Sequence, residues 1–382
     1  MLLLARIILP ILLLVQSPQV MTSGRPPINA LQRTDPKVYD IQFGVNLFTE
    51  IPPGDASLRL AMSVEDAPIV LPIISRGPWS KADLTTVAGR VWVDARGGAT
   101  LTPRLDPNKG FGMTFAVLSV TARAAQSIRW EMTYRMQCWR SALDDRVAAR
   151  ATWPQAWPEE CQDSLKPQLF IESDDQRFID FVAKVSDGQL RSVPPFLAAK
   201  DLIRATINAL RVNGNGLDRG LAGLLRGFEM VGAAKAMEAG VGSPADLVAA
   251  CVAVLRAGGI PARVVVGVDR NLEDGKRPPL SAWAEFYLPD SGWVPFDPMR
   301  MRGNNIARLN VRDPWPWLGT IRDMNDWIPL SYSFHPPNAA LITHGRPCVW
   351  GWDPRPAGVP GPTQQYVTIS TVSRGNGVED PQ

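Results

Sequence analysis

Residues Gly242–Arg263 read GSPADLVAACVAVLRAGGIPAR, a sequence that predicts a single helix with both of its ends marked. Ser243 is a favourable N-cap residue, and Pro244 suits the first helical position because no intrahelical partner is needed for its missing N–H. Asp246 stands three residues after the cap, where its carboxylate can complete a capping box. The Gly-Gly pair before Ile-Pro then ends the helix, so we expect it to span residues 244–257.

The apolar residues of this helix form a broad face. Leu247, Cys251 and Leu255 recur every fourth residue, and valines beside them widen the face. Such a helix is expected in the centre of its domain. Cys251 falls in mid-helix on this face, where a thiol behaves as a small apolar side chain with a raised pKa.

Three strands are expected after the helix, at residues 263–268, 281–288 and 293–297. Residues 281–288 read SAWAEFYL and alternate between two faces, and residues 292–298 read GWVPFDP. The Pro-Asp-Ser-Gly turn between them predicts an antiparallel hairpin. Ser281 and Asp297 then lie near each other at one end of the hairpin, facing the start of the 244–257 helix.

Three motifs at these spacings resemble the core of the transglutaminase-like superfamily. They are Gly-Ile-Pro-Ala-Arg at 259–263, Ala-Trp-x-Glu at 282–285 and Gly-Trp-x-x-x-Asp-Pro at 292–298. The resemblance covers residues 170–300, and the motifs are specific as a set. It implies a papain-like α+β fold in which a central helix packs on an antiparallel sheet.

Members of this superfamily place a nucleophilic Cys at the start of the helix, a His at the start of the next strand and an Asp after the following one. The three slots hold Pro244, Ser281 and Asp297 in this sequence. Proline supplies neither a nucleophile nor a backbone N–H for an oxyanion, and serine cannot replace histidine as a base near neutral pH. The resemblance therefore implies a degenerate triad without catalytic residues, in a protein that binds or scaffolds.

The resemblance also implies a groove beside the degenerate triad. Without the chemistry, such a groove can still hold an extended peptide between aromatic walls, so a protein or peptide partner is expected. The candidate groove residues are Ser243, Pro244, Ser281, Trp283, Glu285 and Asp297.

The alternative is an active cysteine peptidase or transamidase with a site rearranged around Cys251 or Cys348. The chain has two histidines, His335 and His344, and His344 lies close to Cys348 in the sequence. Activation of a cysteine needs a His nitrogen within about 4 Å of the sulfur. A His nitrogen at that distance from a Cys sulfur would favour the active enzyme, and its absence would favour the inactive binding protein.

Alternation of apolar and polar residues dominates residues 38–165 and predicts an all-β sandwich domain. The pattern is clearest at residues 128–138. Residues 22–37 are polar and contain proline, which is typical of a linker.

A helical period returns in residues 166–330, the expected transglutaminase-like core. Besides the helix already described, helices are predicted near 178–185, 197–210 and 228–239. Residues 331–382 are expected to form a C-terminal β extension with a strand at 365–372.

The chain begins with an apolar stretch, residues 1–16, of the size of a signal-peptide core. We interpret residues 1–21 as a signal peptide or an N-terminal membrane anchor, which predicts a periplasmic or extracellular protein. If Met21 is the true start, the protein is cytoplasmic instead.

Composition argues against several other functions. A net charge of +3 over 382 residues, without a basic stripe, gives no indication of nucleic-acid binding. Two His and four Cys without ligand spacing predict no metal site, and the absence of phosphate-loop motifs predicts no cofactor. In an exported protein, a disulfide between Cys138 and Cys161 is compatible with the sequence.

Overall fold

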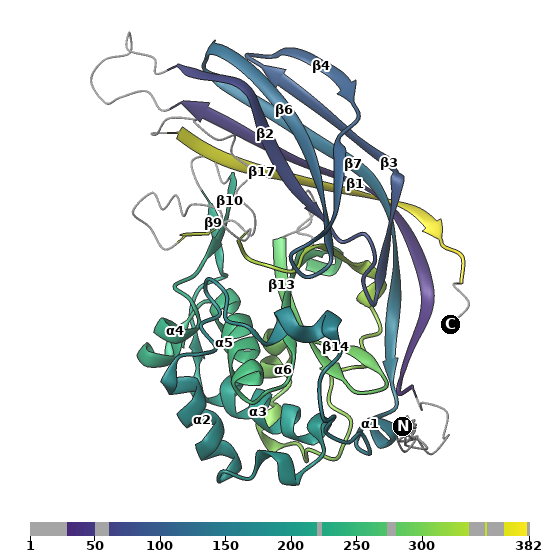
Figure 1. Ribbon diagram of the computed structural model, residues 1–382, viewed down its shortest axis with the longest axis vertical. Helices are drawn as coiled ribbons and strands as arrows, with labels where there is room; N and C mark the ends of the chain where they lie inside the picture. The colour runs from purple at the N-terminus through teal and green to yellow at the C-terminus, as the bar shows by residue number, and fades with distance from the viewer. Residues whose placement is uncertain are drawn as a thin grey trace, which may run out of the picture.

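The computed structural model describes residues 29–49, 61–219, 224–272, 280–335, 348–349 and 363–379. Long strands form one part of the molecule, and helices packed on a second group of strands form the other (Figure 1). The expected α+β class, with a strand-rich N-terminal part followed by a helix-containing core, is confirmed.

The strand-rich part contains two antiparallel sheets, one of order β17-β1-β7-β3-β4 and one of order β2-β6-β5. Alternate residues of β1 and β7 are buried between them, as the period of two predicts. The strands are β1 (Leu31–Thr49), β2 (Met62–Ile73), β3 (Ser80–Val93), β4 (Arg96–Leu101), β5 (Arg104–Lys109), β6 (Met113–Ala125), β7 (Ser127–Leu143) and β17 (Thr363–Asn376).

The predicted linker is wrong for residues 31–37, which form the beginning of β1. Backbone pairing with β7 outweighs the polar composition there, and it places Leu31 opposite Leu143 and Arg33 opposite Ser141. The ladder is irregular between Thr34 and Lys37, around Pro36, because proline has no N–H to donate.

The strand expected at 365–372 exists as part of β17, but it joins the N-terminal sheet. Strand β17 pairs antiparallel with β1 from Lys37 opposite Asn376 to Thr49 opposite Thr363. The last strand of the chain therefore completes the sheet that the first one begins, and Figure 1 shows the two side by side.

The core is built on a four-stranded antiparallel sheet of order β14-β13-β12-β15. Its strands are β12 (Ala262–Asp269), β13 (Leu280–Leu288), β14 (Gly292–Phe296) and β15 (Trp327–Ser331). The α-helices in the described residues are α1 (Asp145–Ala148), α2 (Gln176–Ser186), α3 (Pro195–Ala209), α4 (Ala233–Ala239), α5 (Pro244–Ala257) and α6 (Pro298–Gly303).

Short elements connect these layers. Short strands are β8 (Arg211–Val212), β9 (Leu217–Arg219), β10 (Leu225–Glu229), β11 (Val241–Gly242) and β16 (Cys348–Val349). Short 3-10 helices are η1 (Glu159–Leu165), η2 (Leu190–Ser192), η4 (Arg270–Leu272), η5 (Ile306–Arg308) and η6 (Met324–Asp326).

Helix α5 is the central helix of the core. It contacts α2, α3 and α4 as well as β12 and β13, and every residue from Ala245 to Arg256 is buried. The helix predicted at 228–239 is instead strand β10 followed by α4. Gly232, at φ 97°, separates the two, because this backbone conformation is outside the helical region.

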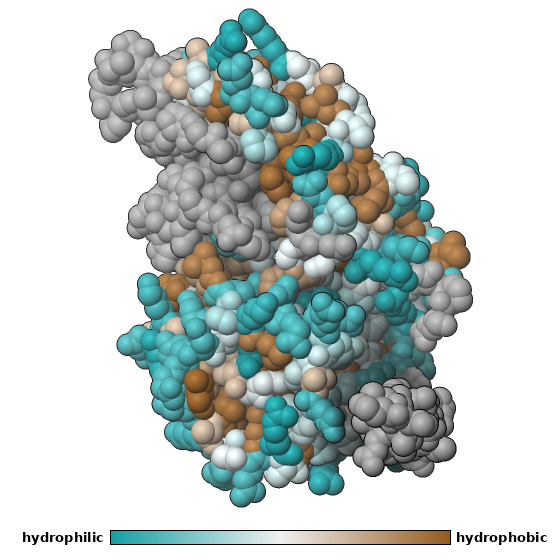
Figure 2. All heavy atoms as spheres, viewed as in Figure 1, coloured by the Kyte–Doolittle hydropathy of each residue, from teal (hydrophilic) through white to brown (hydrophobic). Residues whose placement is uncertain are grey.

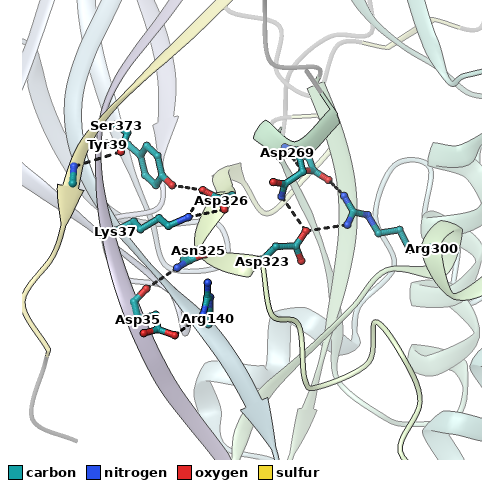
Figure 3. A network of polar contacts seen from close by, with 12 residues as sticks. Asp35, Lys37, Tyr39, Arg140, Asp269, Arg300, Asp323, Asn325, Asp326 and Ser373 are labelled. Carbon is teal, nitrogen blue, oxygen red and sulfur yellow. Dashed lines mark hydrogen bonds and ion pairs between the residues drawn. The ribbon is translucent and has the colours of Figure 1, made fainter. Parts of the chain in front are cut away.

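Polar contacts join the two parts of the molecule (Figure 3). Lys37 Nζ lies 2.7 Å from Asp326 Oδ2, and the Tyr39 hydroxyl donates to Asp326 Oδ1 at 2.6 Å. Asn325 Nδ2 donates to the Asp35 carbonyl at 2.7 Å. These bonds hold η6 of the core against β1.

On the face seen in Figure 2, hydrophilic residues cover most of the helical part, and apolar residues cluster over the strands above it. None of the helices in the described ranges is long and apolar enough to cross a membrane. The apolar residues 1–16, predicted as a signal or anchor, lie outside the described residues.

Candidate functional site

The start of α5 is fixed by the predicted capping box. Ser243 Oγ accepts from the N–H of Asp246 at 3.2 Å, and Asp246 Oδ2 accepts from the N–H of Ser243 at 2.9 Å. Asp246 Oδ1 also accepts from the N–H groups of Val231 and Gly232, both at 2.9 Å. One buried carboxylate therefore ties the first turn of α5 to the residues that precede α4.

Pro244 occupies the first helical position of α5 and is half-buried. Its ring packs on Gly216, where an added Cβ would lie 3.0 Å from Pro244 Cδ. Gly216 has φ 74°, so glycine meets both the backbone and the space requirement there. The first residue of α5 therefore carries a closed pyrrolidine ring, where a polar side chain could otherwise stand.

Ser281 lies near the start of β13, opposite Gly267 of β12. It is half-buried. The hydroxyl is a weak acid and a weak base, so it can hydrogen-bond a ligand and cannot take a proton from a thiol near neutral pH.

Asp297 follows β14 and caps α6. Its Oδ1 accepts from the N–H of Met299 at 2.9 Å and from the N–H of Arg300 at 3.1 Å. Burial raises the pKa of Asp297 to about 6, although these N–H groups and the Arg300 charge favour the carboxylate. The carboxyl group is therefore already committed to the helix that follows it.

Arg300 is a site residue that the sequence interpretation missed. Its guanidinium bonds to Asp269, and its Nη1 lies 3.1 Å from Asp323 Oδ2 (Figure 3). Its Nε also lies 3.5 Å from Asp297 Oδ2. It also stacks 4.4 Å from the centre of the Trp317 ring. The only sequence signal was its position one helical turn after Asp297.

A cavity of about 450 Å³ lies between the start of α5 and the open end of the β13–β14 hairpin. Pro244, Ser281 and Asp297 all line it, as does Arg300. Most of the other lining side chains are apolar. Its further lining residues are Gly214, Asn215, Gly216, Leu217, Phe228, Ala245, Leu272, Leu280, Ala282 and Met299.

Trp283 and Glu285 were predicted to line the groove, and the structure places both elsewhere. Trp283 is buried, with its ring 5.3 Å from that of Trp327. Glu285 is buried too, and its Oε2 accepts from Arg263 Nε at 2.8 Å. Residues of one strand face share a side of the sheet, but the cavity reaches only the end of β13. Ser243, also predicted, is occupied by its capping role and does not line the cavity.

Cys251 is fully buried within α5 and does not line the cavity. Burial raises the pKa of its thiol well above the ordinary value, so the thiolate is disfavoured. Cys348 falls in β16, whose side chains are not described, and His344 lies outside the described residues. His335 is buried.

The predicted Cys138–Cys161 disulfide is wrong, because both residues are buried free cysteines. Cys138 belongs to β7 of the sandwich, whereas Cys161 lies in η1, which packs against α5 and β12 of the core. Across the described ranges, no three His, Cys, Asp or Glu side chains form a group that could hold a metal ion.

Comparison with known proteins identifies the core. Residues 225–298 match the model of the transglutaminase-like superfamily. The chain carries a transglutaminase-like core. No curated protein matches the chain.

One solved structure has a similar fold over most of its length. A candidate cysteine protease from Cytophaga hutchinsonii aligns with a TM-score of 0.52 over 91% of this chain and 94% of its own, at 12% identity, a likeness of fold alone. The periplasmic domain of TgpA from Pseudomonas aeruginosa aligns with a TM-score of 0.31 at 16% identity, over 71% of this chain and 91% of that domain.

Proposed function

We propose that this protein is a catalytically inactive transglutaminase-like protein that binds an extended peptide of a partner protein. The observation that carries the proposal is that Pro244, Ser281 and Asp297 line one cavity. These are the slots where the superfamily places its Cys, His and Asp. Their common cavity supports a site that keeps the superfamily's arrangement while lacking two of its three reacting groups.

The chemistry of the three residues supports inactivity. Pro244 has no nucleophilic atom and no N–H, so the oxyanion loses a donor that is worth roughly 3 kcal/mol in comparable sites. Ser281 offers no base. Asp297 accepts two backbone N–H groups of α6 and contacts Arg300, so its carboxylate serves the fold.

The lining of the cavity supports a peptide as the ligand. Apolar side chains such as Leu217, Phe228 and Leu280 offer a surface for an apolar side chain. The Ser281 hydroxyl and the Asp297 carboxyl stand where they can orient a peptide group. A volume of about 450 Å³ is within the usual range for ligand sites, which is roughly 300–1,000 Å³.

We further propose that the protein works outside the cytoplasm. The apolar stretch at residues 1–16 supports export or anchoring, since a leader of this size directs a chain to the membrane. Fractionation of the native host with an antibody to the core tests this proposal. Recovery of the full-length chain in the cytoplasmic fraction would contradict it.

The binding proposal is tested with a displayed library of random peptides selected on the full chain. Selected peptides should lose binding to Ser281→Phe, which fills the cavity, and keep binding to Ser119→Phe, an exposed strand position in β6. Equal binding of the peptides to both variants would mean that they do not bind in this cavity.

The inactivity proposal needs a separate assay. Purified protein is incubated with a peptide library and with a glutamine-containing casein plus a labelled amine, and products are followed by mass spectrometry. We expect neither cleavage nor amine incorporation. Turnover that disappears in Cys251→Ala or Cys348→Ala would establish the alternative, an active cysteine peptidase or transamidase.

A further inference from the structure

A second cavity, of about 500 Å³, lies where the sandwich meets the core. It is at the turn end of the β13–β14 hairpin, whereas the cavity with Ser281 is at the open end. One wall is the turn before β3, with Arg76 and Trp79, and the opposite wall is the hairpin turn, with Ser291 and Trp293. The N–H of Ala30, just before β1, donates to Ser291 Oγ at 3.1 Å and ties the hairpin turn to the sandwich.

Guanidinium groups dominate the charge of this cavity. Arg33, Arg76 and Arg263 line it, and Glu160 is its one carboxylate among the described residues. Arg76 is exposed, and within the described part of the chain its side chain has no hydrogen-bond or ion-pair partner. Such a set of donors is suited to carboxylates, which a guanidinium binds through two parallel hydrogen bonds.

One wall of the cavity is held rigidly. The Arg263 guanidinium lies between two aromatic rings, 3.9 Å from the centre of the Trp293 ring and 3.6 Å from that of Tyr332. Its Nε also donates to Glu285 at 2.8 Å. The Tyr287 ring packs edge-on against Trp293, 5.4 Å between centres. A ligand therefore meets a preformed aromatic wall on one side. On the other side it meets the exposed guanidinium of Arg76.

The backbone of both turns is already hydrogen-bonded. The N–H of Gly77 donates to the Ser80 carbonyl, and the N–H of Ser291 donates to the Leu288 carbonyl. The Trp79 carbonyl accepts from the N–H of Trp139. An extended peptide that adds to a sheet needs an open strand edge, and these turns offer side chains instead.

We propose that this second cavity binds a short acidic oligosaccharide, whose sugar rings carry carboxylates. Arg76 would meet a carboxylate, with Arg33 beside it, and the half-buried rings of Tyr287 and Trp293 would meet the apolar faces or edges of the sugar rings. Asn29, Ser291 and Glu160 supply donors and acceptors for the sugar hydroxyls. The volume fits two or three sugar units.

The test is isothermal titration calorimetry of the full chain with trigalacturonate, with neutral maltotriose and with citrate. We expect trigalacturonate to bind roughly tenfold more tightly than either of the others. Arg76→Gln should weaken that binding by roughly tenfold, because a charge-assisted hydrogen bond is lost. Arg90→Gln, an exposed arginine near the far end of β3, is the matched control and should bind like the wild type.

Three results would overturn the proposal. They are no binding of trigalacturonate, binding of citrate or maltotriose as tight as that of trigalacturonate, and equal losses in Arg76→Gln and Arg90→Gln. Because the Arg76 side chain has no hydrogen-bond or ion-pair partner among the described residues, its replacement should leave the unfolding transition unchanged. Ser281→Phe should bind trigalacturonate like the wild type, so failure of this proposal and failure of peptide binding are distinguishable.

Discussion

Asp297 and Arg300 lie one turn apart and interact twice. The N–H of Arg300 donates to Asp297 Oδ1 at 3.1 Å, and Arg300 Nε lies 3.5 Å from Asp297 Oδ2. Asp297 is therefore a helix cap with its own cation. In the proposed inactive site, this arrangement gives Asp297 a structural role beside Pro244 and Ser281.

The raised pKa of Asp297 predicts a specific dependence of stability on pH. The folded-state pKa of about 6 exceeds the model-peptide value of 3.8, so the folded state binds the proton more tightly. The resulting stabilisation is complete below pH 4 and is lost as the pH rises to 6. Each pH unit between the two values corresponds to about 1.4 kcal/mol, so the total is on the order of 3 kcal/mol.

Urea unfolding of the wild type and Asp297→Asn between pH 4 and pH 7 measures this dependence. Asparagine is also a good N-cap, so the variant should fold. We expect the variant to lose stability relative to the wild type at pH 4 and to recover part of the difference by pH 7. A constant difference across this range would contradict the assigned pKa.

The sequence predicted the elements whose signals are local. Helix α5 spans Pro244–Ala257 as expected, because its cap, its first proline and its Gly-Gly end are adjacent in the chain. The β13–β14 hairpin followed in the same way from its alternation and turn. Both elements carry the slots of the superfamily motif, which is why Pro244, Ser281 and Asp297 could be placed around one site.

Features that depend on distant pairing could not be predicted. The polar residues 31–37 become a strand only because β7 pairs with them, and β17 joins on the other side from Lys37 onward. Trp283 and Glu285 share a strand face with Ser281, but Trp327 and Arg263 cover them. Those partners come from other strands, so the alternation alone cannot distinguish a cavity from a covered face.

Asp246 should be the most sensitive polar residue of the core. It is buried and accepts from the N–H groups of Val231, Gly232 and Ser243. Asp246→Ala leaves these donors without a partner and should lower the free energy of unfolding by about 3 kcal/mol or more.

Urea unfolding with circular dichroism measures this loss. Asp246→Asn retains one acceptor oxygen and should lose less. Asp175→Ala removes the half-buried cap of α2 and is the matched control, with a smaller loss expected. Equal losses of unfolding free energy in Asp246→Ala and Asp175→Ala would mean that the bonds from Asp246 to the residues before α4 add no stability.

The pair Arg263 and Glu285 should be required for stability. Both side chains are at least nine-tenths buried, and Arg263 Nη2 lies 2.7 Å from Glu285 Oε2. Glu285→Gln leaves the guanidinium buried without its carboxylate, which should cost about 3 kcal/mol or more. Calorimetric melting measures the loss, and Glu238→Gln, which breaks an exposed pair with Arg177, should melt close to the wild type. Similar melting of the two variants would contradict a contribution from burial.

The assignment of Pro244 to the nucleophile slot can be tested by restoring the missing groups. A thiol in Pro244→Cys would sit in the first turn of α5, where the helix dipole lowers its pKa below the ordinary value of about 8.5. Adding Ser281→His places an imidazole on the same cavity, which should lower the thiol pKa further.

The measurement is the rate of alkylation by iodoacetamide against pH, with the labelled cysteine identified by mass spectrometry. The wild type gives the background of the native cysteines, and Ser119→Cys, exposed on strand β6, gives an ordinary thiol away from any helix end. We expect the midpoint pH to fall from Ser119→Cys to Pro244→Cys and again in the double variant. A Cys at 244 that titrates like the one at 119, with no effect of His at 281, would mean that the two slots do not form one site.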